Sequence, residues 1–163
     1  MQDNTMLLDT EELIALSRSA LLKEDYDCAL TKLKLVVRQE QFPIEVYSLL
    51  GRVYAALELF DKSVAAFQEF LTRRPEVVPE RFHLGMVYRN MGENTKAIQV
   101  WDEVLEQAPM FPPALYNKGL YYLDEGNKEE AIELFNYIID HVDPDDSHVE
   151  MANYMLSSMS LSA

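Results

Sequence analysis

The chain has 163 residues, 48% of them apolar, so it can bury a core and does not resemble a disordered protein. Its formal net charge of −14 repels a phosphate backbone and argues against nucleic acid as a partner. Cys28 is the single cysteine, the start MQDNTMLLDT lacks a secretory signal pattern, and no apolar run approaches the ~18 residues of a membrane span. We therefore expect a cytoplasmic protein with no disulfide and no membrane insertion.

The negative charge is concentrated in the second part of the chain. Residues 102–163 carry 13 acidic and 2 basic side chains, whereas residues 1–101 carry 15 and 12. We interpret the acidic part as a solvated face that keeps the protein dispersed, and prefer this to a dedicated acidic docking patch.

After an N-terminal segment (1–9), the stretch Asp9-Thr10-Glu11-Glu12 is typical of a capped helix start. From here the sequence repeats with a period of 34 residues, which indicates helical hairpins. The predicted units are 10–43, 44–77, 78–111 and 112–143, within one structural domain. The positions that recur in phase are Gly51, Gly85 and Gly119; Tyr54, Tyr88 and Tyr122; Phe67, Trp101 and Phe135; Ser63, Ala97 and Ala131; and Pro75 and Pro109.

The third unit shows the expected internal structure most clearly. Its first helix is predicted from Pro79 to Met91 and its second from Thr95 to Gln107. Gly92 ends the first helix because glycine adopts the left-handed conformation that a helix end requires. We expect the small residues at the Gly85 and Ala97 positions to let the two helices approach, and the ring at position 101 to fill the remaining space.

The first unit is degenerate, and the chain ends in an additional helix. Unit 10–43 keeps Leu13, Leu16, Tyr26, Ala29 and Leu33 but has Ser17 where glycine is expected. Residues 144–163 are predicted to form a capping helix and tail, with Asp143 as its N-cap. Its core-facing residues are predicted to be Val149, Ala152, Leu156 and Met159, and its exposed ones Met151, Tyr154 and Met155.

These motifs resemble the tetratricopeptide repeat, whose pattern is W-x2-L-G-x2-Y, then A-x3-F, then P. The third unit matches it at Leu84, Gly85, Tyr88, Ala97 and Pro109, with Arg81 in place of the opening Trp and Trp101 in place of Phe. The resemblance implies an all-α, right-handed superhelical solenoid. It also implies a non-catalytic interaction module whose first helices line a concave groove for a peptide.

The register selects the first-helix residues that do not serve the Leu-Gly-Tyr stripe, and these are the candidate groove residues. Arg18 and Arg52 are 34 residues apart and should form a ladder continued by Arg89, while the other end of the groove is apolar. We therefore expect a partner with an acidic group and apolar anchors. The alternative is that these arginines pair with Glu11 and Glu45 and only keep the groove solvated. The candidate residues are Arg18, Arg52, Phe82, His83, Met86, Arg89, Tyr116, Asn117, Leu120 and Leu123.

Signals for catalysis or cofactor binding are weak. His141 and His148 lie in the acidic segment DHVDPDDSHVE, but their spacing fits neither a calcium loop nor the HExxH zinc motif. Cys28 has no histidine near it in sequence, and there is no phosphate-binding glycine loop. We predict no enzyme activity, no cofactor and no metal.

The leading interpretation is a cytoplasmic adaptor or scaffold that binds a protein partner. One alternative is a small acidic chaperone similar to the bacterial chaperones of secretion-system translocators. Another is a self-assembling structural protein, a homo-oligomer formed through the C-terminal helix. An enzyme or metal protein is the least favoured interpretation.

Overall fold

A computed structural model describes residues 8–160, and all regular structure within this range is α-helical. The chain divides into two compact units, unit 1 (Met1–Gly92) and unit 2 (Glu93–Ala163). The boundary falls in the turn of the third predicted repeat.

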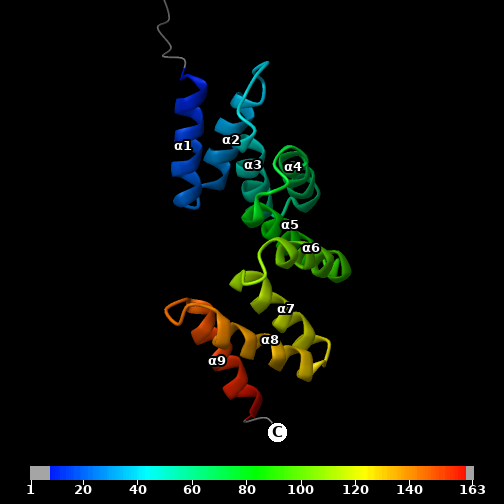
Figure 1. The fold of residues 1–163 in the computed structure, drawn as a ribbon. Coiled ribbons are helices and arrows are strands. Elements are labelled where there is room, and N and C mark those ends of the chain that lie inside the picture. The colour runs from blue at the N-terminus through cyan, green and yellow to red at the C-terminus, as the bar shows by residue number, and fades with distance from the viewer. Residues whose placement is uncertain (1–7, 161–163) are drawn as a thin grey trace, which may run out of the picture. The chain divides into compact units, whose positions relative to one another are not determined.

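Unit 1 contains two helical hairpins and one further helix. In the first hairpin, α1 (Thr10–Leu22) packs against α2 (Tyr26–Val36), and in the second, α3 (Glu45–Ala56) packs against α4 (Phe60–Arg73). The two hairpins meet through α2 and α3, and α5 (Val78–Asn90) packs against α4. Figure 1 shows these helices in blue to green, in chain order.

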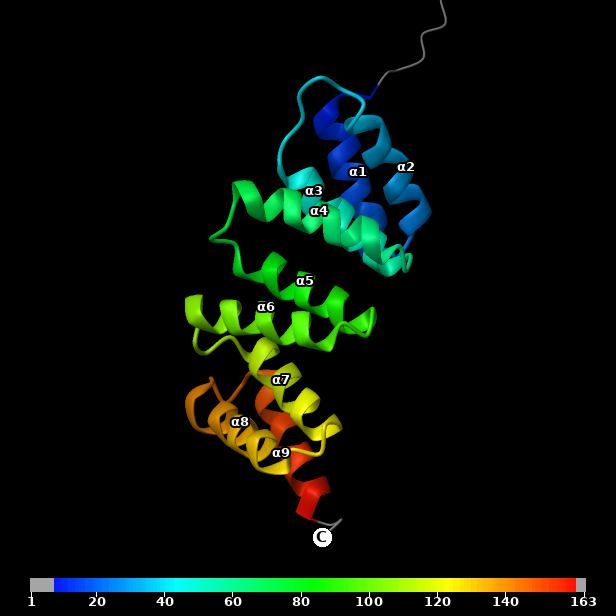
Figure 2. The same ribbon diagram turned by 90° about the vertical axis from the view of Figure 1, so that its right-hand side faces the viewer.

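Unit 2 contains α6 (Asn94–Gln107), the hairpin of α7 (Pro112–Asp124) and α8 (Lys128–His141), and α9 (Ser147–Ser160). The helix α9 packs mainly against α8 and also contacts α7 (Figure 2). The predicted helices of the third unit agree with α5 and α6 to within one residue at each end.

The helix starts follow from local sequence. Asp9 caps α1 in a capping box, because its carboxylate accepts the backbone N–H of Glu12 while the Glu12 side chain accepts that of Asp9. Proline occupies the first turn of α5 and of α7, where a missing N–H costs no intrahelical hydrogen bond. The prediction of a capped start at Asp9 is confirmed.

The four hairpin turns share one left-handed position. Glu24, Glu58, Gly92 and Gly126 are spaced 34 residues apart and have φ values of 59°, 56°, 77° and 81°. In the turn at Glu58, the backbone N–H of Leu59 donates to the carbonyl of Tyr54 at 2.8 Å, which closes the end of α3. Glycine occupies this left-handed position in two of the four turns, and glutamate holds the same strained conformation in the other two.

The recurring glycine of the first helices makes room for an aromatic ring, as predicted. A Cβ atom on Gly51 would lie 2.9 Å from the ring of Phe67, which is fully buried. In the degenerate first unit Ser17 occupies this position, is 1% exposed, and donates its hydroxyl hydrogen to the carbonyl of Ile14. The hydrogen bond lets a polar side chain replace glycine inside the core.

Three expectations differ from the structure. Leu16 is 40% exposed although Leu50 and Leu84, at the same register, are each 6% exposed, because no helix among the described residues precedes α1 to cover it. Met155 is partly buried and packs on the core of unit 2. Asp143 does not cap the last helix, since its carboxylate accepts the N–H of Asp145 in a turn that delays the start of α9 to Ser147.

Candidate functional site

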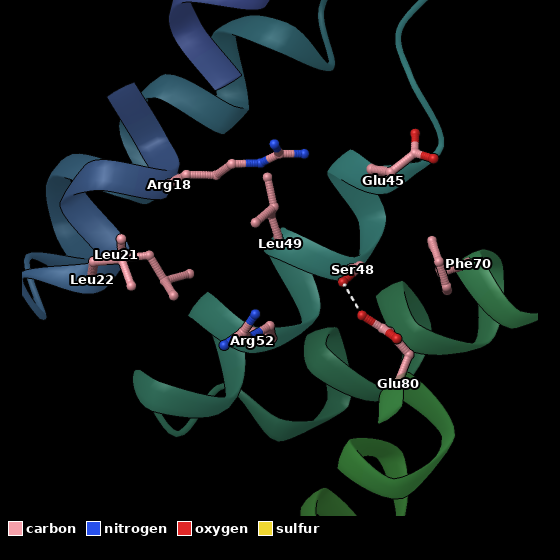
Figure 3. Close-up of a pocket in the computed structure, with 9 residues that line it drawn as sticks. All are labelled: Arg18, Leu21, Leu22, Glu45, Ser48, Leu49, Arg52, Phe70 and Glu80. Carbon is pink, nitrogen blue, oxygen red and sulfur yellow. Dashed lines mark hydrogen bonds between the residues drawn. The ribbon is translucent and has the colours of Figure 1, made fainter. Parts of the chain in front are cut away.

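The predicted groove residues of the first two repeats gather around a cavity of about 380 Å³ in unit 1, which we call the arginine cavity (Figure 3). The guanidinium group of Arg18 extends from α1 toward α3, beside Leu49, and Arg52 lies one turn further along α3. The register predicted this meeting of Arg18 and Arg52. The lining residues are Arg18, Leu21, Leu22, Glu45, Ser48, Leu49, Arg52, Phe70 and Glu80.

A second cavity of about 200 Å³ adjoins the first, because Arg52 lines both. We call it the histidine cavity. Two predicted groove residues, His83 and Met86, lie on its α5 side, and Phe67 contributes from α4. The other lining residues are Ala55, Val87 and Asn90. A partner segment that contacts Arg52 can therefore reach either cavity.

The charges of the arginine cavity are unevenly paired. Glu45 forms an ion pair with Arg74 at 3.6 Å, and Glu80 accepts the hydroxyl hydrogen of Ser48 at 3.0 Å. Arg18 and Arg52 are exposed, and neither forms an ion pair or hydrogen bond with any described residue. The alternative that these arginines pair with Glu11 and Glu45 is thus not what the structure shows among the described residues. The cavity is therefore lined by two arginines without an acidic partner among the described residues, together with apolar side chains.

The surroundings of His83 disfavour its charged form and lower its pKa. Its ring stacks on Phe67 with 6.2 Å between ring centroids and 20° between planes. Burial lowers the pKa of His83, the positive charge of Arg52 lowers it further, and Glu80 opposes the shift. The positive charge of Arg52 therefore acts on His83 across the histidine cavity.

Two other predicted residues of α5 line neither cavity. The ring centroid of Phe82 lies 5.8 Å from that of His83, so Phe82 supports the histidine from the side. Arg89 is partly buried near the end of α5. The predicted ladder of three arginines thus brings together two members, Arg18 and Arg52, at the arginine cavity.

The predicted residues on α7 belong to unit 2 and lie mainly in its core. Tyr116 is 9% exposed, and its ring lies 5.7 Å from Phe135 and 5.9 Å from His148 at the start of α9. Burial raises the pKa of the Tyr116 hydroxyl. Leu120 and Leu123 pack on the same core, and Asn117 donates its amide hydrogen to the carbonyl of Pro113 at 2.8 Å.

Several residues that shape the arginine cavity were outside the predicted set. Phe70 comes from α4, and the register counted only the first helix of each unit. Leu22 is 84% exposed at the end of α1, where helical spacing alone does not separate a groove rim from a turn. Glu80 could have been found, because it lies in the first turn of α5 on the side that faces Ser48.

The histidines of unit 2 have local partners. His148 Nδ1 lies 2.8 Å from a carboxylate oxygen of Asp146, and His141 stacks on Tyr137 with 4.2 Å between ring centroids. Residues 8–160 contain no group of three or more His, Cys, Asp or Glu side chains placed to hold a metal ion. Lys32 Nζ donates to Cys28 Sγ at 2.9 Å, and the thiol is partly buried.

The sequence was compared with known families and proteins. Two profiles, both described as tetratricopeptide repeat, match residues 44–77 and 82–147, which together exceed half of the chain. The chain belongs to the tetratricopeptide repeat family. The degenerate unit 10–43 lies outside both matches. No curated relative matches the sequence.

Solved structures place this tetratricopeptide repeat protein in the same fold class. The crystal structure of MamA has 25% identity and a TM-score of 0.74, over 81% of this chain and 77% of that one. YrrB, described as a TPR protein with an unusual peptide-binding site, has 25% identity and a TM-score of 0.74, over 89% and 74%. TTC0263, a thermophilic TPR protein of Thermus thermophilus, has 21% identity and a TM-score of 0.75, over 91% and 81%.

The fold class is therefore all-α, that of the tetratricopeptide repeat solenoids. This fold indicates a protein–protein interaction module, and proteins that share it are generally non-catalytic. None of the helices in residues 8–160 has the length and apolar character needed to span a bilayer.

Proposed function

We propose that this protein is a non-catalytic, cytoplasmic adaptor, and that its arginine cavity binds an acidic peptide segment of a partner protein. The observation that carries the proposal is the pair Arg18 and Arg52, two exposed cations that face one cavity without an acidic partner in the described chain. A pair of guanidinium groups suits carboxylates, which they bind in a bidentate geometry.

The apolar part of the cavity supports a second requirement on the ligand. Leu49 and Phe70 are buried and form the floor, and Leu22 is exposed at the rim. Burying an apolar anchor against such side chains contributes roughly 25 cal/mol per Å² of apolar surface. The expected ligand therefore carries one aliphatic or aromatic anchor beside one or more carboxylates.

The glutamates of the cavity support an orientation for this ligand. Glu45 lies 3.6 Å from Arg74, which also forms a closer ion pair with Glu76 at 2.6 Å, and Glu80 is hydrogen-bonded to Ser48. Glu45 and Glu80 lie on the α3 and α5 side, away from the end of α1 that carries Leu21 and Leu22 (Figure 3). An acidic group is thus expected beside Arg18 and Arg52, with basic residues tolerated toward Glu80. That YrrB is described as having a peptide-binding site is consistent with this proposal.

The test is fluorescence anisotropy with two labelled peptide series, one acidic and one basic, each with and without a central Phe. The full chain is compared with Arg18→Glu/Arg52→Glu, after circular dichroism shows that the variant is folded. Binding of the acidic Phe peptide is expected to weaken at least about tenfold, since a hot-spot residue contributes about 2 kcal/mol or more.

The matched control is Lys34→Glu/Arg38→Glu, which changes the net charge equally at two exposed positions near the end of α2. This control is expected to keep the affinity of the wild type. Equal weakening by both double variants would show that binding follows net charge and would reject the arginine cavity as the site.

A further inference from the structure

The helix α9 has an outer face with two exposed apolar side chains, Met151 and Tyr154. Its inner face packs through Ala152, which is fully buried, and through its neighbours Val149 and Leu156. On the opposite side Tyr154 is 72% exposed and Met151 is 39% exposed. Spacings of four, three and four residues place four side chains in one uncharged stripe along this face, which we call the α9 stripe. The α9 stripe consists of Ser147, Met151, Tyr154 and Ser158.

This stripe contrasts with the unit that carries it. Unit 2 has 14 acidic and 3 basic side chains, a net charge of −11, yet α9 itself contains one acidic residue, Glu150, and no lysine or arginine. The outer face of a terminal capping element normally carries the polar groups that keep a repeat array from associating. Tyrosine and methionine are instead typical of the centre of a protein interface. The α9 stripe therefore has the composition of a contact surface.

The charges beside the stripe decide what kind of partner fits. Glu150 lies on the same side of α9 as Tyr154, and Asp143 and Asp145 precede the helix in its entry turn. The helix α8, which packs against α9, also exposes Glu133 and Asp140 to solvent. Of the three lysines of unit 2, Lys96 is paired with Glu93 at 3.3 Å and Lys118 with Asp102 at 2.5 Å. Unit 2 therefore keeps a large acidic excess, with Glu150 on the same face of α9 as the stripe.

We propose that the α9 stripe docks a basic amphipathic helix of a partner protein. Apolar residues of that helix would contact Met151 and Tyr154, and lysines or arginines on its flanks would face Glu150 and be attracted by the net negative charge of unit 2. A second copy of this chain is a poor occupant, because two units with a net charge of −11 each repel one another. The proposal is independent of the arginine cavity, which lies in unit 1 and has the opposite charge preference.

The probe is a fluorescein-labelled Leu–Lys peptide designed as an amphipathic helix, with the Leu–Glu peptide of the same pattern as its control. The full-length protein is compared with Met151→Ser/Tyr154→Ser, which removes apolar contacts and leaves every charge in place. We expect the Leu–Lys peptide to bind the wild type at least tenfold more tightly than the double variant. We also expect the affinity to fall as salt is added, and the Leu–Glu peptide not to bind.

Two controls separate the stripe from general attraction to an acidic chain. Leu35→Ser/Leu59→Ser makes a similar exposed apolar-to-serine change in unit 1 and is expected to bind like the wild type. Arg18→Glu/Arg52→Glu is expected to leave this binding undiminished, which separates it from the function proposed for unit 1. Equal affinity of the wild type and Met151→Ser/Tyr154→Ser would overturn the proposal.

Analytical ultracentrifugation of the wild type alone tests whether a second copy of this chain occupies the α9 stripe. A dimer that tightens with added salt and is lost in Met151→Ser/Tyr154→Ser would assign the stripe to self-association and overturn a basic partner. A monomer at all salt concentrations, together with the tenfold loss in the peptide assay, is the result expected from the proposal.

Discussion

Gly119 lies against the ring of Phe135 so closely that a Cβ atom at position 119 would be 2.6 Å from the ring. Phe135 is fully buried in the core of unit 2, and α7 and α8 can approach because Gly119 has no side chain. Gly51 and Phe67 repeat the relationship in unit 1 at 2.9 Å. The fixed spacing of glycine and aromatic residue in the sequence is thus a packing requirement.

Gly119→Ala is expected to destabilise the protein by about 1–3 kcal/mol, the usual cost of overpacking a core. The sign is informative, because Gly→Ala inside an unconstrained helix normally stabilises by roughly 0.5–1 kcal/mol. Urea unfolding followed by circular dichroism measures the change. Asn136→Ala, an exposed change on α8, is the control and should leave the unfolding midpoint nearly unaltered. A Gly119→Ala protein more stable than the wild type would contradict the close approach.

Glu58→Gly is expected to stabilise the protein by about 1 kcal/mol. Glu58 has φ of 56°, and the left-handed conformation costs a non-glycine residue roughly 1–2 kcal/mol. Glycine removes this strain but loses part of the gain through its greater freedom in the unfolded chain. The reverse change, Gly126→Ala, should destabilise through its φ of 81° alone, because no atom lies within 4 Å of the added Cβ. Thermal unfolding of both variants checks the opposite signs.

Much of the fold could be predicted because the 34-residue period repeats both the turns and the contacts between helices. The left-handed turn position at Gly92 and the buried ring positions of Phe67 and Phe135 follow directly from spacing. The exposure of Leu16 could not be predicted from the same pattern. Periodicity gives the face on which a residue lies, but not whether another helix covers that face.

The candidate site could be predicted only in part for the same reason. The register of the first helices predicted that Arg18 and Arg52 lie close together, because equivalent positions of successive repeats lie side by side. Both residues line the arginine cavity. The register placed Tyr116 on the same face, yet the structure buries Tyr116 beside His148. The contact depends on where α9 folds back, and α9 lies outside the repeat. Which carboxylate pairs with which arginine also depends on side-chain geometry that spacing does not contain.

Trp101→Ala is expected to destabilise the protein by about 3–5 kcal/mol, the range for an aromatic side chain truncated in a core. Trp101 is the largest fully buried side chain of the described residues. Trp101→Phe keeps most of the volume and matches the family pattern at this position, so it should cost considerably less. Urea unfolding followed by circular dichroism compares the three proteins. An unfolding midpoint that does not move in Trp101→Ala would show that the ring does not support the core.

The free energy of unfolding of the wild type should fall more steeply below neutral pH than that of a protein without His83. Burial and the charge of Arg52 lower the pKa of His83 in the folded state from its ordinary value of 6.5. As the pH falls below about 6.5, the unfolded chain binds a proton at this histidine before the folded protein does, so unfolding becomes more favourable. His83 therefore leaves the free energy of unfolding unreduced above about pH 6.5. It reduces this free energy progressively as the pH falls toward the lowered pKa of the folded state.

His83→Gln removes this titration and should flatten the decline, so the difference in unfolding free energy between variant and wild type should change between pH 7.5 and pH 5.5. The two proteins are identical at every other position, so the contributions of the remaining side chains cancel in this difference. Arg52→Gln should reduce the slope partly, because it removes the second cause of the shift and leaves burial. Parallel stability curves for the wild type and His83→Gln would mean that the pKa of His83 is the same in the folded and unfolded chains.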